Sequence, residues 1–266
     1  AEVALFERYA EIRNRYFDKR GQQHKDPRTS TSGLFTDRRA LVADPLAFAF
    51  YRSNAMDEAF ERAAEVVEAD ELEFLRGCFA HFAARLDPLV SETRRLAAAS
   101  LARTRASVEQ EPVRAYVDSI RAFFGVTDEL EFTALYVWWP DEDRIQANPD
   151  GPFLLLRVRP QAGEALDSAD VVVHEAVHVI SALQPEAQKR ATSDALLAAC
   201  PNALEHTARL ELLEEPLATV LGNMEFRRRF DPQRFAWGKQ WYAKPGVDLS
   251  ARVLYPALMD ALANGG

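Results

Sequence analysis

The stretch from residue 171 to 180 reads VVVHEAVHVI and places His174 and His178 four residues apart. On a helix, residues four apart lie one above the other on the same face, so both imidazoles can reach one metal ion. Glu175 lies about 100° further round the helix, where its carboxylate can contact a metal-bound water without being a ligand. Nitrogen ligands, an open coordination position and a base beside the bound water make up a catalytic zinc site. The pattern therefore predicts a helix that binds Zn²⁺.

The metal interpretation requires that this stretch is a helix. Five of its ten residues are valine, a poor intrinsic helix former, so tertiary packing must hold the helix in a central, buried position. In a strand, His174 and His178 would lie about 13 Å apart, too far for one ion. We predict a helix from about Ser168 to Leu183, capped by Asp167 or Ser168.

A catalytic zinc site needs a third protein ligand. The metzincin pattern would place a histidine six residues after His178, but Gln184 occupies that position, so this class is excluded. His206 lies in a mainly polar segment and is a weak candidate. Glu214 and Glu215 are better candidates, and because neighbouring helical residues point about 100° apart, only one of them can complete the site.

Small residues favour Glu215 over Glu214. Ala218 and Gly222 lie three and seven residues after Glu215, on the same helix face. A face made of small side chains can approach the helix of the two histidines closely. We therefore predict Glu215 as the third ligand, although a kink at Pro216 could turn Glu214 inward instead.

Residues 215–218 read Glu-Pro-Leu-Ala, which resembles the Glu-Gly-x-Ala pattern of gluzincins. These HExxH metallopeptidases, among them thermolysin-like proteases and zinc aminopeptidases, take their third ligand from a Glu on a later helix. The resemblance covers residues 131–225, and the chain departs from the pattern where Pro216 replaces glycine.

The resemblance implies a zinc-dependent peptidase that cleaves peptide or protein substrates. Glu175 would be the general base that activates the metal-bound water. The class usually has an oxyanion stabiliser, which Tyr242 or Tyr255 could supply. The resemblance implies three zinc ligands, namely His174, His178 and Glu215.

The alternative is a helical binding protein without enzymatic activity, with a structural or vestigial metal site. Glu175 argues against it, because a structural site has no need of a base. The two classes differ in coordination: a structural site takes four protein ligands, and a catalytic site takes three and a water.

Charge and hydropathy limit the partners. The net charge is −9 and the isoelectric point is near 5.2, which argues against nucleic acid and anionic membranes as partners. No apolar run approaches the roughly 20 residues of a membrane span. Because the sequence begins at Ala1 rather than Met, a periplasmic or secreted location is favoured if a signal peptide has been removed.

The sequence leaves the pairing of Cys78 with Cys200 and the oligomeric state open. Two buried thiols are favoured over a single disulfide.

The fold class we expect is α+β and mainly α, with a helical region over residues 1–125. A zincin-like region over residues 126–266 should follow, although the two could form one continuous domain. In the first region, hydrophobic periodicity and helix-breaking residues predict helices over about 2–20, 54–67, 70–86, 88–110 and 112–124, with a break at Asp87–Pro88.

In the second region we expect a small antiparallel sheet before the histidine helix. Its strands are residues 131–139 and 153–158, and residues 148–152 form a turn. The strand 153–158 or its neighbour could bind an extended substrate by β-addition. Further helices should follow, with a kink at Pro216, a solvated charge run at 227–229 and a final helix over 250–262.

Overall fold

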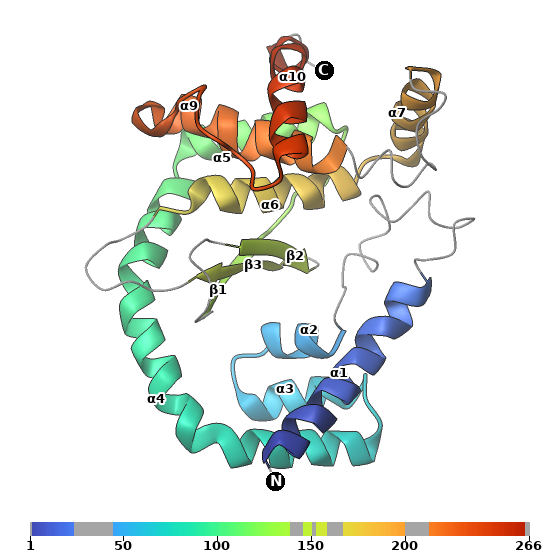
Figure 1. Cartoon of the computed structure of the whole chain (residues 1–266), viewed down its shortest axis with the longest axis vertical. Helices are drawn as coiled ribbons and strands as arrows, with labels where there is room; N and C mark the ends of the chain where they lie inside the picture. The colour runs from blue at the N-terminus through green and yellow to red at the C-terminus, as the bar shows by residue number, and fades with distance from the viewer. Residues whose placement is uncertain are drawn as a thin grey trace. The chain divides into compact units, whose positions relative to one another are not determined.

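The computed structural model describes residues 2–23, 45–138, 146–150, 153–158, 167–199 and 213–263 (Figure 1). The protein is mainly helical with one small sheet, which confirms the expected fold class at that level. Within these residues, no helix combines the length and apolarity that a membrane span requires. Cys200 and His206 lie outside them.

The chain divides into two compact units, and the division falls inside helix α4, between Leu96 and Ala97. Unit 1 contains α1 (Glu2–Gln23), α2 (Pro45–Tyr51), α3 (Met56–Ala63) and the first part of α4 (Ala69–Val108). Unit 2 contains the remaining described elements. This division of contacts lies one helix before residue 125, where the sequence predicts the end of the helical region.

Unit 1 has its own hydrophobic core, which includes Ile12, Phe60 and Leu75. The buried Cys78 thiol is free. The predicted break at Pro88 is wrong, because Pro88 lies within α4. The strong helix formers on both sides of this proline, mainly Ala, Leu and Arg, favour continuation enough to offset its cost of about 3 kcal/mol.

Unit 2 contains the helix that carries both histidines. Its α5 ends as predicted, with Gly125 at φ 65° directly after the C-cap residue Phe124. The helical elements of unit 2 beyond α4 are α5 (Glu111–Phe123), α6 (Ala169–Ala182), α7 (Glu186–Ala199), residues 213–218, the π-helix η1 (Thr219–Glu225), α9 (Phe226–Phe230), the short 3₁₀ helix η2 (Pro232–Arg234) and α10 (Pro245–Ala263).

The sheet has three strands in the order β1-β3-β2, formed by β1 (Thr133–Trp138), β2 (Gln146–Asp150) and β3 (Phe153–Val158). β2 pairs with β3 antiparallel, but β1 pairs with β3 parallel, so the prediction of an antiparallel sheet is wrong for that pair. Consecutive strands do alternate in direction, as turns require. The parallel pair arises because β3 lies between β1 and β2, whereas an antiparallel sheet in chain order would place β3 at the outer edge of β2.

The predicted turn at 148–152 is also wrong in part, because residues 148–150 are the end of β2. A proline is tolerated there because β2 is an edge strand, where an amide is not needed on the outer side. β3 is hydrogen-bonded on both sides and therefore has no free edge for a substrate strand. Among the described strands, only β1 and β2 lie at an edge that could accept an added strand.

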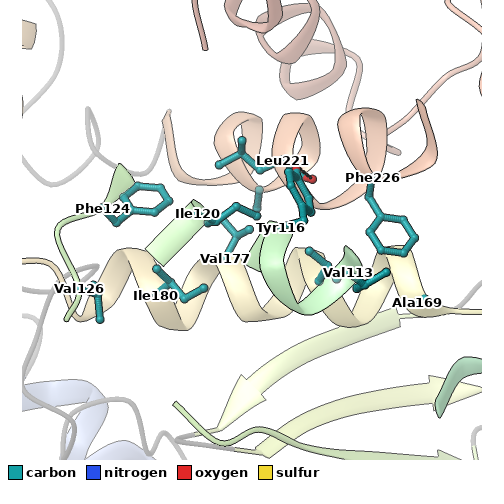
Figure 2. Close-up of a cluster of buried hydrophobic side chains, with 12 residues drawn as sticks. Val113, Tyr116, Ile120, Phe124, Val126, Ala169, Val177, Ile180, Leu221 and Phe226 are labelled. Carbon is teal, nitrogen blue, oxygen red and sulfur yellow. Dashed lines mark hydrogen bonds between the residues drawn. The ribbon is translucent and has the colours of Figure 1, made fainter. Parts of the chain in front are cut away.

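α6 lies between the sheet and the helices of unit 2. Leu154 and Leu156 of β3 pack against Val172, Ala176 and Val179 on one side of α6. On its other side, side chains of α6 meet those of α5, η1 and α9 (Figure 2). Twelve of the 14 residues of α6 are buried, which explains how packing overrides the weak helix propensity of five valines. Because α5 shares this core, it belongs to unit 2.

Candidate metal centre

α6 presents both histidines in the predicted arrangement. His174 and His178 are 7% and 8% exposed, and their Nε2 atoms lie 3.2 Å apart. The predicted N-terminus is confirmed as well. Ser168 occupies the N-cap position, but the capping bond comes from Asp167, whose Oδ1 accepts the backbone N–H of Ala169 at 3.0 Å.

Glu215 points its carboxylate at the same two nitrogen atoms. Its Oε2 lies 3.5 Å from His174 Nε2 and 3.8 Å from His178 Nε2. One donor atom from each of the three residues falls within 4.8 Å of the others, and the described residues contain no other such group of three or more His, Cys, Asp or Glu. The group combines two imidazole nitrogens and one carboxylate oxygen, which is a donor set that zinc binds.

One atom of this group has no hydrogen bond, although both imidazoles lie near it. Glu215 Oε2 is buried and accepts no hydrogen bond from the described residues. An orphaned buried carboxylate oxygen costs free energy unless a proton or a cation compensates it. The arrangement therefore fits a divalent metal. The Glu215 side chain as a whole is 36% exposed, so the group reaches solvent on this side.

The outer nitrogens of both rings are hydrogen-bonded. His174 Nδ1 lies 2.8 Å from Asn223 Oδ1, and His178 Nδ1 lies 3.0 Å from Glu214 Oε1. Asn223 Nδ2 donates to the Asp170 carbonyl at 3.4 Å, which directs the Asn223 oxygen toward His174. Each Nδ1 therefore donates, and the lone pair of a neutral ring lies on Nε2, toward Glu215.

Both neighbouring glutamates thus contact the histidines. Sequence reasoning took Glu214 as a rival of Glu215 and did not anticipate that it orients His178. It also missed Asn223, which no motif marks. The proximity of Asn223 to the small residue Gly222 was the one available signal.

The close approach expected at Gly222 is confirmed. A Cβ at this position would lie 2.3 Å from His174 Cα and 2.5 Å from its backbone nitrogen, so no larger residue fits without displacing α6. Ala218 is fully buried in the same core. The two small residues let the backbone of the third-ligand helix lie directly against α6.

A wide helical turn follows the third ligand. Residues 213–218 are helical through Pro216, and the chain then continues as a π-helix over η1 and as an α-helix over α9. The kink predicted at Pro216 would involve Leu212, which lies outside the described residues, so it stays a prediction. The irregularity that the structure does contain is the i→i+5 pattern of η1. π-helical turns occur frequently at functional sites.

Burial and charge shift the acid–base properties of the group. Burial raises the pKa of Glu175, which is 5% exposed, and the nearby histidines only partly oppose this effect. Burial also acts to raise the pKa of Glu215, but His174, His178 and the Tyr242 hydroxyl outweigh it and lower the pKa to about 2. Burial would lower the pKa of His178, but its bond to Glu214 and the neighbouring carboxylates raise it.

The two candidate tyrosines lie in different places. The Tyr242 ring stacks on the His174 ring, with the ring centres 6.1 Å apart and the planes at 16°, and the Tyr242 hydroxyl acts to lower the pKa of Glu215. The Tyr255 hydroxyl instead donates to Glu225 Oε2 at 2.5 Å. Of the two, Tyr242 is the one beside the candidate ligands.

No protein-family model, curated protein or solved structure matches this chain. The site must therefore be interpreted from its own geometry.

Proposed function

We propose that the protein is a zinc-dependent peptidase of gluzincin type, in which His174, His178 and Glu215 hold the metal. The convergence of three donor atoms, one of them the orphaned Glu215 oxygen, is the observation that carries this proposal. Among the described residues the group has three protein donors and not four, which favours a catalytic over a structural metal site.

Zinc at this position would polarise the scissile carbonyl and lower the pKa of a bound water toward ~7. Glu175 accepts the proton of the attacking water and passes it to the leaving amine. Its raised pKa suits that role, because the group must be basic before the step and acidic after it. Asn223 and Glu214 hold the two imidazoles in the tautomer that presents Nε2.

An extended peptide is the substrate class that the sheet suits best. β2 is an edge strand and contacts α6, the helix that carries both histidines. A peptide that pairs with the outer edge of β2 would satisfy its backbone hydrogen bonds along the strand.

The test combines metal analysis with one substitution. Purified protein should contain about one zinc per chain, and a chelator should remove it. Glu175→Gln should keep the zinc and abolish cleavage in a peptide-library digest, because an amide cannot accept the proton of the water. If the protein takes up no transition metal at neutral pH, or if the Glu175→Gln variant remains fully active, the proposed function is wrong.

A further inference from the structure

The segment between α9 and α10 is fastened to α10 by one carboxylate. Asp248 Oδ1 accepts the backbone N–H of Trp241 at 2.6 Å and that of Tyr242 at 3.3 Å. Two consecutive amides therefore share one acceptor, which fixes the direction of the chain at Tyr242. Hydrogen bonds to a charged acceptor are stronger than neutral ones, so this is a firm attachment.

Arg252 extends the attachment to the rest of the segment. Its Nε donates to Asp248 Oδ2 at 2.8 Å, and its two terminal nitrogens donate to the backbone carbonyls of Trp237 and Lys239. The guanidinium thus joins the carboxylate that holds Tyr242 to the chain that precedes it. Asp248 and Arg252 lie one turn apart on α10 and form a clasp around residues 237–242.

Tyr242, at the end of the segment that the clasp holds, lies at the candidate metal centre. The Tyr242 ring lies nearly parallel to the His174 ring, with the two ring centres 6.1 Å apart. The segment has little regular structure of its own: only η2, at residues 232–234, precedes Tyr242. The position of the tyrosine therefore depends on how the segment is held.

We propose that Asp248 and Arg252 are positioning residues, which hold the segment so that the Tyr242 ring lies against His174. The two residues act through Tyr242 and do not themselves touch the ligand atoms. The effect on the metal rests on the proposed function, whereas the placement of Tyr242 does not.

The test uses the whole 266-residue chain without metal and follows the ring resonances of its five histidines in NMR spectra. Tyr242→Leu removes the aromatic ring and displaces the His174 resonances, which gives a reference shift. Asp248→Leu removes both acceptor atoms and should produce most of that displacement. Asp248→Asn keeps a carbonyl oxygen for the two amides and should stay close to the wild type.

Two further variants complete the design. Asp260→Asn makes the same chemical change on the exposed side of α10 and should leave His174 unchanged. If Asp248→Leu does not fold, Arg252→Met loosens the clasp more mildly and should move His174 in the same direction. The double variant Asp248→Leu/Tyr242→Leu should match Tyr242→Leu alone, because both changes act through one ring.

Zinc titration of the same variants gives the second readout. Tyr242→Leu and Asp248→Leu should each weaken zinc binding about tenfold, and the double variant should lose no more. Unshifted His174 resonances in both Asp248→Leu and Arg252→Met, or losses that multiply in the double variant, would overturn the positioning role. If the wild type binds no zinc but Asp248→Leu and Arg252→Met still displace the His174 resonances, the clasp is supported and the proposed function is rejected.

Discussion

Glu214 and Glu215 are neighbours in sequence but contact the histidines on different sides. Glu215 lies near the Nε2 atoms of both histidines, and Glu214 accepts a hydrogen bond from Nδ1 of His178. Glu215→Ala should therefore remove high-affinity zinc binding. Glu214→Ala should retain the metal but weaken its binding by roughly 10–100-fold, because it releases the orientation of one ligand.

Competition with a chelating dye measures both affinities. Glu186→Ala on α7 is a suitable control, because this side chain is 65% exposed and pairs only with Lys189 among the described residues. Equal losses in the Glu214 and Glu215 variants would contradict the division of roles. A larger loss at Glu214 would reverse it.

At this scale, sequence spacing predicts the histidine pair, because a helix alone brings residues four apart together. The structure also places Glu215 beside them. The sequence favours this residue because the small side chains of Ala218 and Gly222 lie on its helix face. Asn223 could not be predicted. Its contact with His174 depends on the wide turn of η1, and no local sequence rule identifies a π-helical turn.

Gly222 sets the distance between α6 and η1. A methyl group there would overlap the backbone of His174, so Gly222→Ala should force the two elements apart. We expect a loss of about 1–3 kcal/mol or more in the free energy of unfolding, together with weaker zinc binding. Urea unfolding and zinc titration would measure the two effects.

Gly246→Ala is the matched control, because a Cβ at that position meets no atom within 4 Å. It should change neither stability nor zinc affinity appreciably. A Gly222→Ala variant as stable as the control would show that α6 and η1 can separate at little cost.

A second prediction for η1 concerns pH. Glu225 is fully buried and accepts hydrogen bonds from Arg228, Arg229 and Tyr255. Burial acts to raise its pKa, but these partners outweigh burial and lower the pKa below its ordinary value of 4.5. Because the folded pKa is lower than the unfolded one, the stabilisation is present above pH 4.5 and is lost as the pH falls through the folded pKa.

Glu225→Gln should consequently destabilise the protein by about 1–3 kcal/mol at pH 7, a range that allows for solvent screening of the two half-exposed arginines. The difference from the wild type should shrink as the pH falls below 4.5. Urea unfolding at a series of pH values would test this. Glu109→Gln, which alters an exposed pair with Arg105, should have little effect at any pH.

At the element scale, the sequence predicts where strands and helices occur better than how they pair. The order β1-β3-β2 could not be read from turn signals, which indicate only that the chain reverses. The predicted solvated charge run at 227–229 is wrong for Arg227, which is 6% exposed and bonded to Asp170 and Asp231. Asp170 lies 57 residues away in the sequence, beyond any local pattern.

At the scale of the whole molecule, all three candidate ligands belong to unit 2. Zinc should therefore slow hydrogen exchange in α6 and η1, because a ligand that binds only the folded state suppresses local opening. Exchange in α1, α2 and α3 should change little. Mass spectrometry of the protein with zinc and with chelator would compare the two units directly.

Equal protection of unit 1 by zinc would contradict this expectation and show that the units open together. The division itself was not predictable from composition, because it falls within the continuous helix α4. A boundary inside a helix carries no glycine, proline or polar linker to mark it. The long-range packing of α5 against α6 decides it instead.

The π-helical turn of η1 has a consequence for how this chain can vary. Glu215 and Asn223 are 223 − 215 = 8 residues apart, and in a regular α-helix residues at that spacing point about 80° apart. A π-helical turn contains more residues than an α-helical turn, and this difference lets both side chains face α6. Insertions or deletions before residue 213 leave this register intact. The loss of a single residue between Glu215 and Asn223 would turn one of them away from the histidines, so the length of this short stretch is as constrained as the identity of its ligands.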